Sequence, residues 1–376
     1  MAALLLVPVC IALAGFLLSH FAGKGKINWK EFAVQMVIVI PVVLAGWYMA
    51  RGYQMSDTEI WNGTIAKKWE EKVSCCHSYQ CNCYESCTGT GANRSCSTIC
   101  QTCYEHSRDK AWKATTSNGE MAYNNGCNSP SSHAPHRWNA IVEGEPTAIE
   151  HEFVNYIKAN PDSVMRRHGV LEQFGDRIPE YPRVYDHYRA DRYIVMDLAS
   201  PDYKKLNYRL NQINGRLGVR KQVNIIVILT KEPDQMYLEA LTEAWVGGKK
   251  NDLVVIVGAP DYPKVGWVGV MSWTTVEKLK LSIRDRIMEL PEFDGMEILN
   301  IVEQEVDKKF LRRQMAEFEY LKATIEPPAK VFWTLFGVSI LLAVGLQIFF
   351  YKFDPFHAEH GRMSFRPASF RRRYRY

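Results

Sequence analysis

The stretches that decide the fold are QVNIIVILT at residues 222–230 and DLVVIVGAP at residues 252–260. Both are short, apolar and rich in β-branched side chains, which predicts two buried strands. KVGWVGVMSW at 264–273 predicts a third strand. Because the first two stretches are apolar almost throughout instead of alternating with polar residues, we expect helices to cover both faces of the sheet.

Helices are predicted around these strands, because apolar residues recur there at helical spacing. The predicted helices cover 201–218, 233–248, 274–291 and 297–328. The first should end at Gly215 or Gly218, since glycine commonly ends a helix. The last should lead toward the apolar segment at 331–351. The order helix, strand, helix, strand, strand, helix, helix predicts a small α/β domain over 200–326.

Three segments contain no Asp, Glu, Lys or Arg: 3–21, 32–50 and 331–351. Each has about 20 residues, the length that a helix needs to cross the apolar layer of a bilayer. The first segment could instead be a cleaved signal peptide, but it lacks a basic n-region. The sequence therefore predicts a membrane protein with three transmembrane helices.

The distribution of Lys and Arg predicts the orientation of these helices. Lys24, Lys26 and Lys30 lie in the loop 23–31, and basic residues fill the tail 352–376. We expect both segments in the cytoplasm, with the N-terminus and residues 51–330 outside it. In a bacterium the outer region would lie in the periplasm.

The basic tail accounts for much of the net charge of +5. Such a tail beside a bilayer is expected to contact anionic lipid headgroups. The residues expected to make these contacts are Arg371, Arg372, Arg373 and Arg375. Nucleic acid is the less favoured partner.

A cysteine-rich segment occupies residues 75–127, outside the cytoplasm in this topology. It holds nine of the ten cysteines: Cys75, Cys76, Cys81, Cys83, Cys87, Cys96, Cys100, Cys103 and Cys127. Clustered cysteines in an oxidising compartment usually form disulfides. Residues 75–135 are poor in Leu, Ile and Val, so crosslinks would have to stabilise this module. An odd number of cysteines leaves one thiol over.

Zinc is the alternative to disulfides, since Cys100 and Cys103 form a CxxC pair. The candidate ligands are Cys81, Cys83, Cys100, Cys103, His77 and His106. A redox role for the CxxC pair is a third hypothesis. We favour disulfides and no cofactor.

Two further stretches have local patterns. SDTEIWNGTIAKKWEEKVS at 56–74 predicts either a strand with a turn or a helix. In 148–167, apolar residues such as Ile149, Phe153 and Ile157 recur at helical spacing and predict a helix. The region 179–196 is dense in Tyr and Arg, which suits either packing or a partner-binding face.

The run EAWVGGKKNDLVVIVGAPDYPKVGWVGVMSWTTVEKLKLSIRDRI at 243–287 resembles the TPM domain family. The residues that match this family are Trp245, Gly247, Gly248, Lys249, Asp252 and Leu253. The resemblance covers 200–326 and implies an extracytoplasmic domain tethered by a transmembrane helix. It also implies roles such as acid phosphatase activity, repair of membrane complexes or modulation of a membrane receptor.

A phosphatase would need carboxylates that hold a metal or a nucleophile next to them. Asp252 and Asp261 are the weak catalytic candidates near the strand ends. The cysteine-rich segment resembles that of uncharacterised membrane proteins encoded by tailed bacteriophages, which would imply a bacterial inner membrane.

The favoured hypothesis is a membrane-anchored scaffold or modulator that binds another membrane or envelope protein. One alternative is a TPM-type phosphatase acting outside the cytoplasm. The other is a self-assembling membrane homo-oligomer, because small residues such as Ala12, Ala14 and Gly15 permit close helix packing. The predicted segments are 1–22, 23–31, 32–50, 51–135, 136–199, 200–326, 331–351 and 352–376.

Overall fold

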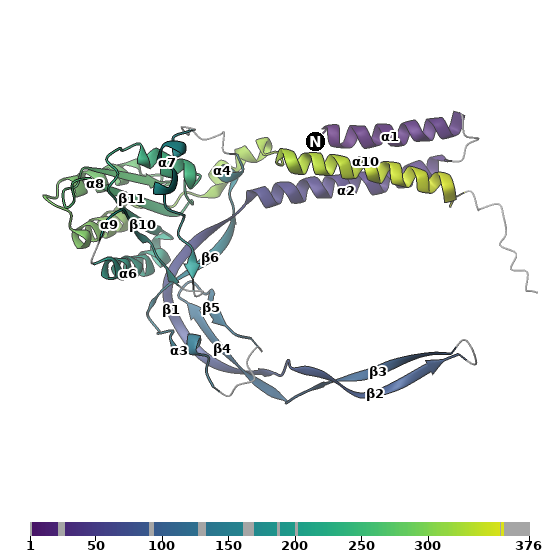
Figure 1. Cartoon of the computed structure of the whole chain (residues 1–376), viewed down its shortest axis with the longest axis horizontal. Helices are drawn as coiled ribbons and strands as arrows, with labels where there is room; N and C mark the ends of the chain where they lie inside the picture. Colours follow the sequence, from purple (N-terminus) through teal and green to yellow (C-terminus); the bar gives the residue numbers. More distant parts are fainter. Residues whose placement is uncertain are drawn as a thin grey trace, which may run out of the picture. The chain divides into compact units, whose positions relative to one another are not determined.

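The structure is a computed structural model, and it forms two compact units (Figure 1). It describes residues 2–21, 27–89, 94–126, 133–160, 169–185, 189–199, 202–353 and 355–356. One unit consists of 57–322. The other joins the two ends of the chain, Met1–Ser56 with Ala323–Tyr376.

The unit formed by the chain ends contains the helices α1 (Ala2–Phe21), α2 (Trp29–Met55) and α10 (Ala329–Phe353). All three are long and apolar enough to cross a membrane. α2 begins earlier than predicted because Asn28 and Glu31 form a capping box at its N-terminus.

The three helices pack against one another within this unit. The Gln35 amide donates a hydrogen bond to the Ala343 carbonyl at 2.8 Å, and the Gln347 amide donates to the Ala12 carbonyl at 3.4 Å. A Cβ atom at Gly15 would overlap the Gln347 side chain. Ala12 and Gly15 therefore serve close packing inside a single chain.

The unit formed by 57–322 contains a four-stranded sheet of order β12-β11-β10-β9. Its strands are β9 (Tyr193–Met196), β10 (Asn224–Thr230), β11 (Asp252–Gly258) and β12 (Trp267–Ser272). β10 is parallel to β9 and to β11, whereas β12 is antiparallel to β11. Three of these strands agree with the sequence prediction, and β9 comes from the Tyr- and Arg-rich connecting region.

Helices cover both faces of this sheet: α6 (Tyr203–Lys221), α7 (Tyr237–Ala244), α8 (Glu277–Met288) and α9 (Gly295–Lys309). Residues such as Val227 pack in the cluster with α6, α8 and α9, while residues such as Ile228 pack in the cluster with α7. The predicted order of elements and the two covered faces are confirmed.

Two predicted helix ends are wrong. α6 continues through Gly215 and Gly218 to Lys221, because these glycines face β1 (Ser56–Ser74) instead of ending the helix. The last predicted helix stops at Lys309, and the 3-10 helix η4 (Met315–Thr324) follows it.

A second sheet has the order β5-β4-β1-β6. It comprises β1, a strand of 19 residues, with β4 (Arg108–Thr116), β5 (Met121–Asn124) and β6 (Pro146–Val154). β6 replaces the predicted helix over 148–167, and only α4 (Tyr156–Ala159) follows. Ile149, His151 and Phe153 are half-buried and alternate with exposed residues, which is the period of a strand. Residues 161–168 lie outside the described part of the chain.

Short elements complete this unit. They are α3 (His136–Asn139), α5 (Leu171–Phe174), η3 (Gly175–Arg177), β7 (Val184–Tyr185) and β8 (Arg189–Ala190). β7 and β8 pair with each other as an antiparallel two-stranded sheet. Phe174 of α5 belongs to the apolar cluster between the sheet and α7.

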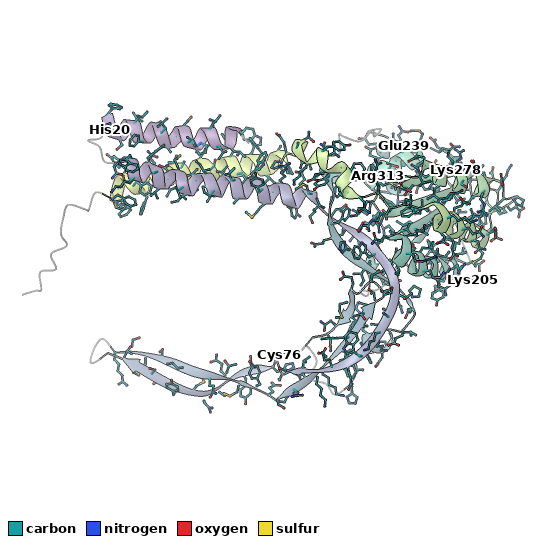
Figure 2. All side chains as sticks on the ribbon, turned by 180° about the vertical axis from the view of Figure 1, so that it is seen from behind. His20, Cys76, Lys205, Glu239, Lys278 and Arg313 are labelled. Atoms are coloured by element: carbon teal, nitrogen blue, oxygen red, sulfur yellow. A yellow bond between two sulfur atoms is a disulfide. The ribbon has the colours of Figure 1, made fainter. Side chains whose placement is uncertain are left out.

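The cysteine-rich segment is a ribbon of two antiparallel strands, β2 (Ser78–Thr88) and β3 (Ser95–Tyr104). Three disulfides join the strands: Cys81–Cys103, Cys83–Cys100 and Cys87–Cys96 (Figure 2). The predicted disulfide-rich module is confirmed for these six cysteines. Cys75 and Cys76 take no part in the three disulfides, and Cys127 lies outside the described residues.

Candidate functional site

The two catalytic candidates lie at opposite ends of β11. Asp252 is the first residue of β11, and the exposed Asp261 follows the strand's last residue in a loop. At about 3.3 Å per residue, a strand of this length separates its ends by roughly 20 Å. The structure therefore does not bring these carboxylates together into one site.

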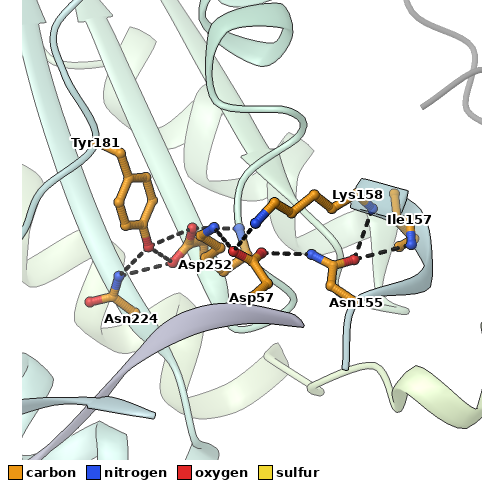
Figure 3. A network of polar contacts seen from close by, with 8 residues as sticks. Asp57, Asn155, Ile157, Lys158, Tyr181, Asn224 and Asp252 are labelled. Carbon is orange, nitrogen blue, oxygen red and sulfur yellow. Dashed lines mark hydrogen bonds and ion pairs between the residues drawn. The ribbon is translucent and has the colours of Figure 1, made fainter. Parts of the chain in front are cut away.

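Asp252 is buried and is part of a polar network (Figure 3). Its carboxylate accepts hydrogen bonds from the Tyr181 hydroxyl at 3.0 Å, the Asn224 amide at 2.9 Å and the Lys249 backbone N–H at 2.7 Å. Burial raises the pKa of Asp252 to about 6, although these hydrogen bonds oppose the rise. Each carboxylate oxygen is occupied, so this side chain holds neighbouring elements together.

Asp57, the second residue of β1, forms the other half of the network. It accepts hydrogen bonds from the ammonium groups of Lys249 at 2.6 Å and Lys158 at 3.0 Å, and from the Asn155 amide at 2.8 Å. Burial alone would raise the pKa of Asp57, but the hydrogen bond and charge of Lys249, together with the hydrogen bonds of Asn155 and Lys158, outweigh it and lower the pKa. Lys249 thus joins both aspartates, one through its backbone and one through its side chain.

A cleft of about 570 Å³ opens beside this network. Asp57, Lys158, Tyr181 and Lys249 are among the residues that line it. Both lysines are already paired with Asp57. Asp252 does not line the cleft, although the Tyr181 hydroxyl that donates to it belongs to a lining residue. The cleft therefore borders a network that attaches β1 to the α/β sheet.

A buried arginine extends the network on the far side of Asn224. The Arg192 guanidinium donates to Asn211 at 2.6 Å and to Asn224 at 3.3 Å, and it contacts Asn62 of β1. Burial lowers the pKa of Arg192 to about 10. Sequence reasoning missed Asp57, Asn62 and Arg192 because their partners come from distant parts of the chain.

The predicted zinc ligands are divided between two places. The sulfurs of Cys81, Cys83, Cys100 and Cys103 are joined in disulfides, so they are not available as thiolate ligands, and this ligand set is wrong. The imidazoles of His77 and His106 do lie together, with ring centroids 5.8 Å apart.

The arginines proposed for lipid contact, 371–373 and 375, lie outside the described residues.

Three large, exposed side chains of the β2–β3 ribbon lie on the same face. Tyr79, Tyr84 and Ile99 are 52%, 61% and 44% exposed. Tyr84 pairs with Ile99, and Tyr79 pairs with Cys103, which lies on the same side of β3 as Ile99 because side chains alternate along a strand. We call Tyr79, Tyr84 and Ile99 the ribbon face.

Both strands of the ribbon also have an outer edge, because β2 and β3 form a sheet of only two strands. The backbone N–H and C=O groups along such an edge can pair with a further strand. The ribbon thus combines exposed tyrosines with two strand edges.

Comparisons of the chain with protein-family models, curated proteins and solved structures find no match.

Proposed function

We propose that the protein is a membrane-anchored scaffold that binds another membrane or envelope protein through the β2–β3 ribbon. The observation that carries this proposal is that the β2–β3 ribbon is crosslinked by disulfides although its strands have no buried apolar core. The side chains of both strands are exposed or half-buried, yet three disulfides fix their pairing. Such crosslinks restrict the unfolded chain, so they maintain a defined surface where apolar packing cannot.

The chemistry of the ribbon face favours a protein partner. Tyrosine is enriched at the residues that contribute most to protein interfaces, because it buries a large area and keeps a polar end. The partner would contact Tyr79 and Tyr84, and a strand of it could pair with an edge of the ribbon. Acidic or basic side chains are few along β2 and β3, which suits an interface with little charge.

In this proposal α1, α2 and α10 are the membrane anchors. The positions of Lys24, Lys26 and Lys30 support an outer location for 57–322, and an oxidising compartment is consistent with the disulfides. The TPM resemblance, the phage origin and the lipid-binding tail remain predictions from the sequence.

The observations favour the scaffold over the two alternatives. For a phosphatase, Asp252 and Asp261 lie at opposite ends of β11, and Asp252 is buried. For self-assembly, Ala12 and Gly15 already pack inside the chain's own helix unit.

The test is co-purification of a partner with the full-length chain from its native membrane. We expect a complex larger than the 43.2 kDa chain, which the triple variant Tyr79→Ser, Tyr84→Ser, Ile99→Ser no longer forms. Tyr208→Ser removes an equally exposed tyrosine from α6 and should leave the complex intact. A triple variant that retains the partner at the wild-type stoichiometry would overturn the proposal, and a mass that is a multiple of the chain's own would favour self-assembly.

A further inference from the structure

Two short junctions face each other at the base of the ribbon. The ladder between β1 and β4 ends at the pair Ser74–Arg108, and the ladder between β2 and β3 begins at Ser78–Tyr104. Residues 75–77 and 105–107 connect the two ladders, and Figure 2 marks Cys76 at this point. The Glu105 backbone N–H donates a hydrogen bond to the His77 carbonyl at 3.1 Å, so the junctions are held side by side.

Four side chains converge from these junctions and from the start of β4. One ligand atom each from Cys75, His77, His106 and Asp109 lies within 4.8 Å of the others. The Cys75 sulfur is 3.7 Å from His77 Nδ1, and His77 Nδ1 is 3.2 Å from Asp109 Oδ2. His106 Nε2 contacts the other oxygen of Asp109.

The two separations at His77 Nδ1 fit tetrahedral coordination of zinc. With zinc bonds of about 2.0–2.1 Å to nitrogen or oxygen and about 2.3 Å to sulfur, tetrahedral ligands lie roughly 3.3 Å apart for nitrogen and oxygen. The same bond lengths place sulfur roughly 3.6 Å from nitrogen. The distances of 3.2 Å and 3.7 Å at His77 agree with both values.

The burial of the cluster is a second, independent observation. The side chain of Asp109 is only 3% exposed, and its two oxygens face the imidazoles of His77 and His106. A buried carboxylate is costly unless positive charge lies beside it, and a zinc ion bound among these groups would supply that charge. The imidazoles of His77 and His106 are 26% and 37% exposed, which leaves a path by which an ion can enter.

We propose that Cys75, His77, His106 and Asp109 bind one zinc ion. A mixed set of thiolate, imidazole and carboxylate ligands suits Zn²⁺ better than Mg²⁺ or Ca²⁺, which prefer oxygen. Four protein ligands are typical of a structural site, so the ion would hold the two junctions together at the base of the ribbon. On binding, the Cys75 thiol loses its proton to solvent and no redox partner is needed. This inference does not depend on the scaffold function.

Zinc content of the full-length protein in detergent tests the proposal. After loading with zinc and dialysis, we expect about one zinc ion per chain by elemental mass spectrometry. His106→Ala and Asp109→Ala should lose it. Cys76→Ser, next to the proposed ligand, and His136→Ala, an exposed histidine on α3, should retain it. Peptide mapping that finds all three disulfides in each variant will show that lost zinc is not lost folding.

Cobalt substitution then identifies the sulfur ligand. The Co²⁺ form of the wild-type protein should show a thiolate-to-cobalt charge-transfer band, which Cys75→Ser abolishes and Cys76→Ser keeps. Alkylation gives a further check, because a zinc-bound Cys75 becomes reactive on addition of a chelator without a reductant. Wild-type protein that retains no more zinc than His106→Ala would overturn the proposal, and so would a native disulfide at Cys75.

Discussion

At the scale of single residues, the charged side chains of the buried network come from distant positions in the sequence. Asp57 and Lys249 are 192 positions apart in the chain and meet at 2.6 Å. No local sequence pattern predicts such a pair, so the sequence identified Asp252 only as a carboxylate near a strand end. Its burial and its three donors are consequences of the tertiary fold.

The raised pKa of Asp252 makes stability depend on pH. The folded pKa of about 6 exceeds the ordinary value of 3.8, so the folded state binds this proton more tightly than the unfolded state. This stabilisation is complete below about pH 4 and is lost as the pH rises through 6, a change on the order of 3 kcal/mol. Asp252→Asn lacks the titration.

We therefore expect the stability deficit of Asp252→Asn, relative to wild type, to be largest near pH 4 and to shrink toward pH 7. Denaturant unfolding of both full-length proteins in detergent, followed by tryptophan fluorescence, measures this difference. A deficit that stays constant across this pH range would contradict the assignment.

At the scale of elements, local signals located β10, β11 and β12 and the helices of the α/β domain, but not β9 or the ends of α6 and α9. β10 and β11 are continuous apolar runs bounded by turns, so each is recognisable alone. β6 was mistaken for a helix because Ile149 and Phe153 satisfy both a period of four and a period of two. The pairing of β6 beside β1, which settles the choice, is a long-range contact.

The glycines of α6 give a prediction at this scale. A Cβ atom at Gly218 would overlap the backbone carbonyl oxygen of Asn62 in β1, and one at Gly215 would lie 2.9 Å from the carbonyl oxygen of Gly63. Alanine gains about 1 kcal/mol of helix propensity, but overpacking costs about 1–3 kcal/mol. The net effect of these two terms is a destabilisation of about 0–2 kcal/mol. Gly218→Ala should fall toward the upper end of this range, because the backbone atoms of Asn62 cannot move aside easily.

Gly52→Ala is the matched control, since its Cβ would meet no atom within 4 Å. Thermal unfolding of the two variants in detergent separates the gain in helix propensity from the cost of overpacking against β1. A Gly218→Ala variant that unfolds at or above the wild-type temperature would contradict the close contact between α6 and β1.

At the scale of the whole molecule, the apolar segments and the cysteine cluster were visible in the composition. The sequence predicted crosslinks, but it did not predict an extended ribbon, because the pairing of Cys87 with Cys96 depends on the register of β2 and β3. It also placed His77 and His106 with the wrong cysteines. Their true neighbours are Cys75, which lies in a junction at the end of the ladder, and Asp109, which lies at the start of β4.

The proposed topology predicts which residues a membrane-impermeant thiol reagent can reach. Both cysteine variants are made in a chain in which Cys10, Cys75, Cys76 and Cys127 are serine, so that only the introduced thiol reacts. Tyr208→Cys on α6 should react in intact cells, because 57–322 lies outside the cytoplasm in this proposal. Ser364→Cys in the tail should react only after the membrane is permeabilised. Labelling of Ser364→Cys in intact cells would reverse the proposed orientation.

The most direct test of the scaffold proposal is photocrosslinking from the ribbon face. An azidophenylalanine at position 84 keeps the shape of Tyr84 and captures whatever contacts it in the native membrane. We predict one adduct of defined mass from position 84, which disappears when Tyr79 and Ile99 are changed to serine, and no such adduct from position 208. Equal adducts from both positions, or none from position 84, would contradict the proposal that the ribbon binds a partner.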